Sequence, residues 1–348
     1  MLNDARILII RLGGMGDVIF TLPAVCALRE AFPRARLSYL TDRAFVPLLE
    51  GFGEFETVRG LDRAACKALN LRVLLGGTAG LLLHVKQARY RLVLDFQSFG
   101  ETAWLTWLSR APDRWGSVYR PGRSWAYTRP VRRNPALHPV DYNLQLLREA
   151  GGLTPASHPG RFTVPESALC QARDMYQSHQ LDPQRQTILF HPFTSTPQKN
   201  WPLEHYLAVA RMARQSGLQV LFGGGPADAA TLEPARLAGY AVTAGAPLMV
   251  SGALASLATL VVGGDTGLPH LALAMGRRVL IIMGSIGAGA CYPYGHPEWT
   301  VVPPEGSPVS AVPADAVWRA CSGALADMSG QAPGAGQYST ELHPEFTL

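Results

Sequence analysis

The sequence predicts an α/β fold made of two doubly wound parallel sheets. Short apolar runs alternate with turns and with stretches of helical spacing, and glycines follow several of the runs. This alternation starts afresh near residue 187, so the chain contains two such series. Its 348 residues suit two domains, and 47% hydrophobic against 16% charged residues provides large cores and excludes a disordered chain or a coiled coil.

The first series begins with the apolar strand 6–11, which ends at a glycine-rich turn. The pattern then predicts strands at 37–40 and 91–95, and helices at 18–32, from 46, at 102–109 and at 140–150. The Pro-, Ser- and Gly-rich residues 152–165 indicate the approach to a linker. We therefore expect an N-terminal domain over residues 1–165.

The second series predicts strands at 187–191, 219–222, 260–262 and 278–283, and helices at 202–216, 268–275 and 312–328. The uncharged stretch 246–264 fits a short helix followed by a buried strand better than a membrane span. We expect a C-terminal domain over residues 166–330 and a frayed tail over 331–348. Two facing sheets of this kind place ligands at the carboxyl ends of their strands, in a cleft between the domains.

Charge and cysteine content limit the class of protein. The net charge of +5 suits an anionic ligand, but no nucleic-acid-binding module accompanies it, so we expect no nucleic-acid partner. Five scattered cysteines without a CxxC pair predict reduced thiols and no zinc site. Without a signal-peptide pattern at the start, the expected location is the cytoplasm.

The turn after the first strand contains Gly13 and Gly14 and leads into a helix near Asp17. Its glycines let a ligand approach the backbone closely, and the helix N-terminus offers unpaired N–H groups. Asp17 has two interpretations. Carboxylates at helix starts commonly cap the helix, which position alone favours. The alternative is a general base that faces the cleft.

The loop after strand 187–191 gathers three hydroxyls and an ammonium, at Thr194, Ser195, Thr196 and Lys199. Donors together with a compact positive charge are what a diphosphate needs at a strand exit. The alternative is a solvated loop in which Lys199 faces water. The clustering favours phosphate binding.

The loop after strand 260–262 is the most specific, with Asp265, Thr266 and Gly267 at a helix start and His270 one turn further on. Asp265 suits sugar hydroxyls, and Thr266 and Gly267 suit phosphate through backbone N–H groups. The alternative is helix capping, with His270 as a core residue. A fourth strand-exit loop, with a less specific pattern, contains Asp228, which suits hydrogen bonds from the hydroxyls of a ribose.

Within the Pro- and Gly-containing stretch 111–139, residues 114–133 interleave arginines with aromatic residues. Two interpretations stay open: recognition of an anionic glycolipid or of a membrane surface, or a solvated loop. Under the first interpretation, Arg120 and Arg123 contact the acceptor, and the chain makes a peripheral contact with the inner membrane.

Three of these motifs together resemble the family 9 glycosyltransferases, the ADP-heptose:lipopolysaccharide heptosyltransferases. Residues 7–18 with 21–24 resemble the family's opening, 199–202 its Lys-x-Trp-Pro segment, and 262–270 its Asp-Thr-Gly-x-x-His signature. Their order and spacing hold from about residue 6 to residue 325. The chain departs from the family pattern at 13–14, at 193 and at 284–287, all close to the expected cleft.

The resemblance implies the GT-B fold of two Rossmann-like domains and an inverting, metal-independent glycosyl transfer without a cofactor. It implies an ADP-sugar donor and a lipopolysaccharide core or related glycan acceptor. The acid that matches Asp17 is the family's base, the lysine that matches Lys199 contacts the donor diphosphate, and Asp265–Gly267 match the donor-binding segment. An acid near Asp228 serves the nucleoside.

Two other classes stay open. A nicotinamide- or flavin-dependent oxidoreductase would use the glycine-rich turn and Asp42, although the third glycine of G-x-G-x-x-G is missing. A non-catalytic sugar-nucleotide binding protein would keep the loops of Lys199 and Asp265 and would not need Asp17.

Overall fold

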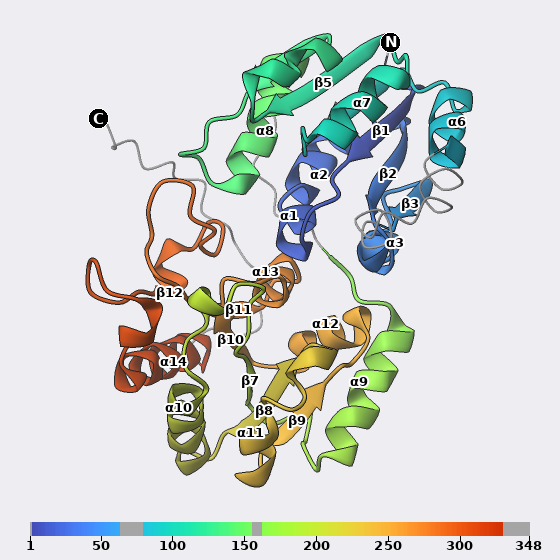
Figure 1. Ribbon diagram of the computed structural model, residues 1–348. Helices are drawn as coiled ribbons and strands as arrows, with labels where there is room; N and C mark the ends of the chain where they lie inside the picture. The colour runs from blue at the N-terminus through green and yellow to red at the C-terminus, as the bar shows by residue number, and fades with distance from the viewer. Residues whose placement is uncertain (1, 63–78, 155–161, 330–348) are drawn as a thin grey trace.

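The computed structural model describes residues 2–62, 79–154 and 162–329, which form two lobes (Figure 1). Each lobe is built on a six-stranded parallel sheet. The strand orders are β3-β2-β1-β4-β5-β6 and β12-β11-β10-β7-β8-β9. Both sheets have the Rossmann strand order, with β9-β8-β7-β10-β11-β12 of the second sheet equivalent to β3-β2-β1-β4-β5-β6 of the first. The predicted pair of doubly wound sheets is therefore confirmed.

The N-terminal lobe contains the first six strands and the helices that cover them. Its strands are β1 (Arg6–Ile10), β2 (Arg36–Asp42), β3 (Thr57–Leu61), β4 (Leu92–Asp95), β5 (Asp113–Val118) and β6 (Arg129–Arg132). Its helices are α1 (Met15–Ile19), α2 (Leu22–Ala31), α3 (Val46–Phe52), α6 (Ala79–Gln87), α7 (Gly100–Leu108) and α8 (Pro139–Gly151), with the 3-10 helices η1 (Arg43–Phe45) and η3 (Pro121–Ala126).

The C-terminal lobe repeats this plan. Its strands are β7 (Thr187–His191), β8 (Gln219–Gly224), β9 (Ala241–Ala244), β10 (Leu260–Gly264), β11 (Arg278–Ile282) and β12 (Thr300–Val301). Its α-helices are α9 (Glu166–Ser178), α10 (Leu203–Gln215), α11 (Glu233–Leu237), α12 (Leu248–Leu257), α13 (Gly267–Ala274) and α14 (Ala314–Ser329). Its 3-10 helices are η4 (Pro197–Lys199), η5 (Pro226–Asp228), η6 (Pro297–Trp299) and η7 (Val309–Ala311).

The central strands are apolar on both faces because helices cover both sides of each sheet. In β1, Ile7 and Ile9 face one hydrophobic cluster, and Leu8 and Ile10 face another on the opposite side. All four are at most 3% exposed. Full burial of such a side chain contributes about 1.5–3 kcal/mol, so these short runs fix the centre of the sheet.

Two local expectations were wrong. The predicted helix 18–32 is two helices, α1 and α2, because Pro23 has no N–H to continue a helix and instead lies in the first turn of α2. The solvated-loop interpretation of 114–133 fails for β5 and β6, which extend the sheet in parallel. The predicted frayed tail 331–348 lies outside the described residues.

The two lobes meet where α1 packs against α13 (Figure 1). Gly267 at the start of α13 permits this approach, because a Cβ there would overlap the Met15 side chain. Helix α1 follows β1 and α13 follows β10. The carboxyl ends of the two sheets therefore face each other.

Candidate active site

Four loops at this junction follow the strands on either side of the point where each sheet reverses its strand order. In the N-terminal lobe these strands are β1 and β4, and in the C-terminal lobe they are β7 and β10. Ligands of open α/β sheets bind at this point, beyond the carboxyl ends of the strands. The loops carry Asp17, Gln97, Lys199 and Asp265, respectively.

Asp17 forms an ion pair with Arg11 at the end of β1. Arg11 Nη2 lies 2.8 Å from Asp17 Oδ1, and Arg11 Nη1 donates a hydrogen bond to the carbonyl of Phe96 at 2.6 Å. Burial of the guanidinium opposes its charge, but Asp17 outweighs burial and raises the pKa of Arg11. The Asp17 side chain keeps 39% of its surface exposed. Buried Arg11 thus orients the Asp17 carboxylate from the interior of the lobe, and the other side of the carboxylate is exposed to solvent.

The capping interpretation of Asp17 is wrong. The N-cap residue of α1 is Gly14, and within the described chain no side chain accepts a hydrogen bond as its cap. Asp17 lies in the first turn of α1 instead, where the helix dipole favours a negative charge.

Gln97 fixes the glycine-rich turn beside Asp17. Its Oε1 accepts hydrogen bonds from the backbone N–H groups of Gly13 and Leu12, at 3.0 and 3.2 Å. The turn that holds Gln97 is itself built on buried Asp95, which accepts from the Gln97 N–H at 2.9 Å and from the Tyr127 hydroxyl at 2.8 Å. Burial raises the pKa of Asp95. This network gives the turn a defined position over β1.

The C-terminal lobe presents a second charged group in Lys199, Asp265 and His270. Lys199 Nζ donates to Asp265 Oδ2 at 2.8 Å, and His270 Nε2 lies 3.4 Å from Asp265 Oδ1. Burial opposes the charge of Asp265, but the bonds from His270 and Lys199 outweigh it and lower the carboxyl pKa. The hydrogen bond to Asp265 raises the pKa of Lys199. The ammonium therefore bonds to Asp265 and does not face only water, although the Lys199 side chain is 55% exposed, and phosphate binding by Lys199 stays a prediction.

The segment after β11 carries Cys291, whose thiol is half-buried. Burial and the carboxylate of Asp265 raise its pKa to about 12, and Lys199, Asp17 and Arg11 also contribute to the electrostatic field there. The lobes also touch directly, since the His270 ring packs edge-on against Phe20, with 4.7 Å between centroids. Because Asp17 lies on α1 and Asp265 directly precedes the N-cap residue of α13, the packing of α1 against α13 brings the segments that carry the two charged pairs together.

A second set of contacts holds the lobes together on the α8 side. The Tyr294 hydroxyl donates to Asp141 Oδ1 at 2.8 Å, and His138 Nε2 lies 3.1 Å from the carbonyl of Tyr292. Burial lowers the pKa of His138 to about 4, so its ring is neutral near pH 7. The segment after β11 therefore closes onto the start of α8.

Several predicted donor residues also shape their own loops. The Thr194 hydroxyl bonds to the Thr196 carbonyl at 2.8 Å or to Asn200 Oδ1 at 2.9 Å. Asp228 Oδ2 accepts from the Gly225 N–H at 2.7 Å. Ser195 and Thr196 are exposed. The Thr194 hydroxyl and the Asp228 carboxylate still have lone pairs that can accept hydrogen bonds from a ligand. The donor-binding roles of these residues stay predictions.

The N-terminus of α13 has Thr266 as its N-cap residue. Its side chain makes no capping hydrogen bond in the described structure. The capping interpretation of this loop is therefore wrong for Thr266. The backbone N–H groups of the first turn, beginning at Gly267, remain available to an anion.

The two predicted acceptor arginines lie on the face of α7 and η3. Arg123 donates to the Ser98 carbonyl at 2.6 Å and lies 5.9 Å from the Phe99 ring centroid. Arg120 is exposed at the N-cap of η3. Arg123 thereby supports the segment that carries Gln97, while acceptor contact stays a prediction for both.

A family model supports the assignment that the motifs suggested. Residues 80–306, more than half of the chain, match the model described as glycosyltransferase family 9 (heptosyltransferase). The chain belongs to this family. The predicted resemblance and the predicted glycosyltransferase class are both confirmed.

The family 9 chain is similar to curated heptosyltransferases along most of its length. It is 27% identical to lipopolysaccharide heptosyltransferase 1 of Pseudomonas aeruginosa over 307 residues, which covers 84% of this chain and 82% of the relative. It is 25% identical to lipopolysaccharide heptosyltransferase 1 of Escherichia coli K12 over 300 residues, covering 83% and 91%.

Solved structures agree with the GT-B fold of this glycosyltransferase. A family 9 glycosyltransferase from Veillonella parvula superposes with a TM-score of 0.83 at 21% identity, covering 94% of this chain and 99% of the other. The E. coli heptosyltransferase WaaC, solved with ADP-2-deoxy-2-fluoro heptose, gives 0.74 at 22% identity, covering 91% and 99%.

Two residues that contact the predicted site were not assigned a role from the sequence motifs. Arg11 pairs with Asp17, and Gln97 holds the glycine turn. Arg11 stands inside the first motif, next to a strand exit, which is a usable signal. Gln97 reaches the turn from a distant segment and carries no local signal.

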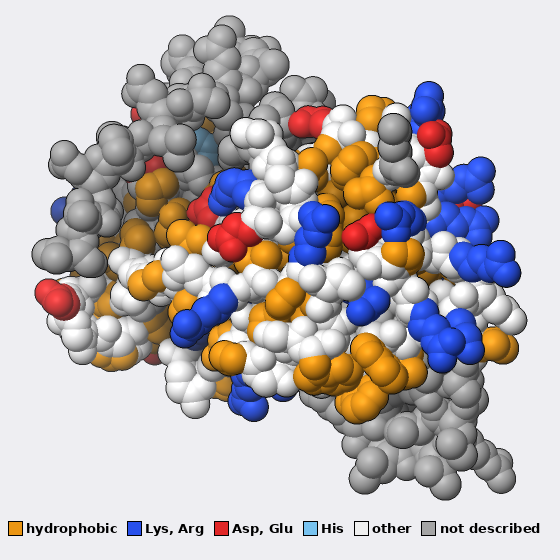
Figure 2. Space-filling view, turned by 90° about the horizontal axis from the view of Figure 1, so that it is seen from above, with side chains coloured by type: hydrophobic (Ala, Val, Ile, Leu, Met, Phe, Trp, Pro, Cys, Tyr) orange, Lys and Arg blue, Asp and Glu red, His pale blue; other side chains and the backbone are white. Residues whose placement is uncertain are grey.

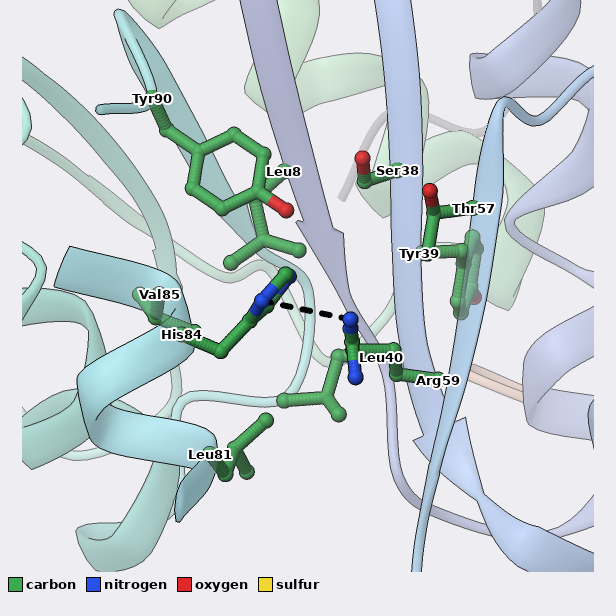
Figure 3. Close-up of a pocket in the computed structure, with 10 residues that line it drawn as sticks. All are labelled: Leu8, Ser38, Tyr39, Leu40, Thr57, Arg59, Leu81, His84, Val85 and Tyr90. Atoms are coloured by element: carbon green, nitrogen blue, oxygen red, sulfur yellow. Dashed lines mark hydrogen bonds between the residues drawn. The ribbon is translucent and has the colours of Figure 1, made fainter. Parts of the chain in front are cut away.

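A small cavity in the N-terminal lobe is separate from this site (Figure 3). It lies between β2, β3 and α6, and Figure 3 shows Arg59 and His84 bonded across it at 3.2 Å. It has room for about one water molecule, which excludes a sugar nucleotide.

The described ranges also lack two other kinds of feature. They contain no group of three or more His, Cys, Asp or Glu side chains arranged to hold a metal ion. No helix within them is both long and apolar enough to span a bilayer.

Proposed function

We propose that this enzyme transfers a heptose from an ADP-heptose to the lipopolysaccharide core, with inversion at the anomeric carbon. The observation that carries the proposal is the packing of α1 against α13, which brings together the segments that carry the Arg11–Asp17 pair of one lobe and the Lys199–Asp265 pair of the other. The curated relatives are named lipopolysaccharide heptosyltransferases, and WaaC structures hold ADP and an ADP-heptose analogue.

In this proposal the C-terminal lobe binds the donor. Lys199 and the uncapped N-terminus of α13 stabilise the diphosphate, because both present positive charge where the leaving group becomes negative. Asp265 accepts hydroxyls of the sugar, and His270 holds Asp265 in place. The hydroxyls of the loop 194–196 add donors for phosphate, and Asp228 accepts from the ribose.

The N-terminal lobe then supplies the base. An acceptor hydroxyl attacks the anomeric carbon while its proton passes to an Asp17 oxygen. The bond from that carbon to the β-phosphate oxygen breaks, and ADP leaves with the electron pair. Attack from the face opposite the phosphate inverts the centre. Gly13 and Gly14 have no side chains, so the acceptor reaches Asp17 closely.

No step of this mechanism requires a metal ion or an organic cofactor. The positive charge that the departing diphosphate needs comes from Lys199 and from the backbone N–H groups of α13. Metal independence is thus part of the proposal, and a chelator tests it.

We further propose that residues 1–165 form the acceptor domain and 166–330 the donor domain. The enzyme acts in the cytoplasm, in peripheral contact with the inner membrane where a lipid-linked acceptor lies. Arg120 and Arg123 contact the acceptor on this side.

A donor screen tests the proposed function. Purified enzyme is incubated with ADP-, UDP- and GDP-sugars and a panel of core acceptors, and products are measured by mass spectrometry. We expect consumption of an ADP-heptose with release of ADP and a product of inverted configuration. Retention of a sugar nucleotide without turnover for every acceptor would favour a binding protein. A bound flavin or nicotinamide, detected by absorbance, would favour an oxidoreductase.

A further inference from the structure

Three tryptophan side chains form an exposed cluster on the surface of the N-terminal lobe. Trp104 and Trp107 lie on α7, and Trp125 lies on η3, which packs against α7. Their ring centroids are 4.8–6.0 Å apart. Nevertheless the residues are 54%, 45% and 47% exposed. We call these three residues the tryptophan patch.

The segments that carry the patch also expose other apolar side chains and two arginines, Arg110 and Arg120. Tyr119, Phe99 and Leu108 are also exposed, at 57%, 38% and 38%. Figure 2, which looks down on the N-terminal lobe, shows hydrophobic side chains gathered near the lower edge of the view with Lys and Arg side chains beside them. Arg110 lies just after the end of α7, and Arg120 occupies the N-cap position of η3.

The charge of this region is unusual for the chain. Residues 99–133 contain seven arginines and two acidic residues, a net charge of +5 that equals the formal net charge of all 348 residues. The other residues of the chain therefore sum to a formal charge of zero, and the positive net charge comes from residues 99–133, which also carry the tryptophan patch.

We propose that the tryptophan patch and its arginines dock on the surface of a bilayer that contains anionic lipid. Tryptophan rings favour the headgroup region of a membrane because one edge is polar and the rest apolar. Arginines near an anionic surface strengthen such binding. Docking of a second copy is disfavoured, because a two-fold contact places the same arginines opposite each other.

The patch is connected to the site by short steps. Helix α7 begins three residues after Gln97, which holds the turn of Gly13 beside Asp17. Arg123 of η3 donates to the Ser98 carbonyl in the same segment. Docking through the patch therefore holds the lobe that carries Asp17 at the bilayer. This inference rests on the proposed function, because a lipid-linked acceptor lies in the membrane. Binding of the patch to the membrane does not itself depend on which sugar the enzyme transfers.

Vesicle co-sedimentation tests the proposal without donor or acceptor. The full chain is mixed with vesicles of phosphatidylethanolamine and phosphatidylglycerol, or with phosphatidylcholine alone. We expect sedimentation with the anionic vesicles that weakens in high salt. The variant W104S/W107S/W125S should bind about tenfold or more weakly, and Arg110→Gln a few-fold more weakly. Leu237→Ser, at a residue 81% exposed on the C-terminal lobe, is the matched control and should bind like wild type.

A second readout protects the test against a folding defect. Brominated lipid in the same vesicles should quench the tryptophan emission of the wild type, which requires no variant. Circular dichroism and the melting temperature check the triple variant. Equal sedimentation of wild type and a folded triple variant, or no quenching, overturns the proposal. A wild type that is dimeric and fails to bind vesicles, with a monomeric triple variant, would assign the patch to a second copy instead.

Discussion

Arg11 holds Asp17 from within the lobe, with Nη2 of the guanidinium 2.8 Å from Oδ1 of the carboxylate. The side chain of Arg11 is 6% exposed and that of Asp17 is 39% exposed. A buried cation that also bonds the Phe96 carbonyl cannot move far. The pair therefore fixes the direction of a carboxylate that stays open to a ligand.

Asp17→Asn should lower kcat about 10²–10⁴-fold while ADP affinity stays within about twofold, because the amide cannot accept the acceptor's proton. Steady-state kinetics and calorimetric titration with ADP measure the two effects. Asp4→Asn, at an exposed pair with Arg34, is the matched control and should leave kcat unchanged. Equal turnover of the folded Asp17→Asn variant would remove Asp17 from the mechanism.

Arg11→Lys should lower kcat about tenfold or more and leave the KM for the donor nearly unchanged. The guanidinium of Arg11 contacts both Asp17 and the Phe96 carbonyl through two different nitrogens. The single nitrogen of a lysine ammonium cannot reproduce both contacts in the same geometry. Full kinetics and a melting curve separate positioning from instability. Arg34→Lys on the surface serves for comparison. A variant with wild-type kcat would show that Asp17 needs no orientation by Arg11.

Asp265→Asn should destabilise the fold by about 1–3 kcal/mol at pH 7, because it weakens the bonds to Lys199 and His270. The folded pKa of Asp265 is lowered from 3.8, so its contribution is complete above about pH 4 and is lost as pH falls through the lowered value. Urea unfolding of both proteins from pH 7 to pH 3 measures the difference. A difference that is unchanged at pH 3 would contradict the assignment.

Gly267→Ala should reduce turnover about tenfold, because the new methyl group overlaps Met15 and separates α1 from α13. Adding Met15→Gly removes the overlapping atoms and should restore part of the activity. Gly276→Ala, beyond the end of α13 where nothing lies close but φ is +74°, controls for strain that does not involve the lobe contact. No rescue by the second change would mean that the α1–α13 contact does not control the site.

Chelation with EDTA should leave initial rates unchanged within about 20%, since the proposed electrophilic groups are Lys199 and the backbone of α13. Rates before and after dialysis against EDTA, followed by addition of Mg²⁺ or Mn²⁺, check this. A loss of activity that one of these ions restores would replace the proposed mechanism by a metal-assisted one.

Sequence patterns predicted the centre of each lobe well and its edges poorly. The runs at β1, β7, β10 and β11 are apolar on both faces, which gives a clear signal. Strands β3, β5 and β6 were not predicted. No residue of β3 is buried, β6 is largely exposed, and β5 opens with the charged residues Asp113 and Arg114, so all three depend on pairing with a neighbour for their structure. Local pattern carries no information about such pairing.

The sequence alone determined the fold class, the family and the loops that carry Asp17, Lys199 and Asp265, because backbone turns, strand periodicity and short motifs are local properties. Only the tertiary structure decided what each side chain bonds. It gave Asp17 a partner in Arg11 instead of a helix cap, it paired Lys199 with Asp265 across 66 residues, and it packed α1 of one lobe against α13 of the other. The last two contacts join distant segments, and they exist only once burial of both cores has brought those segments together.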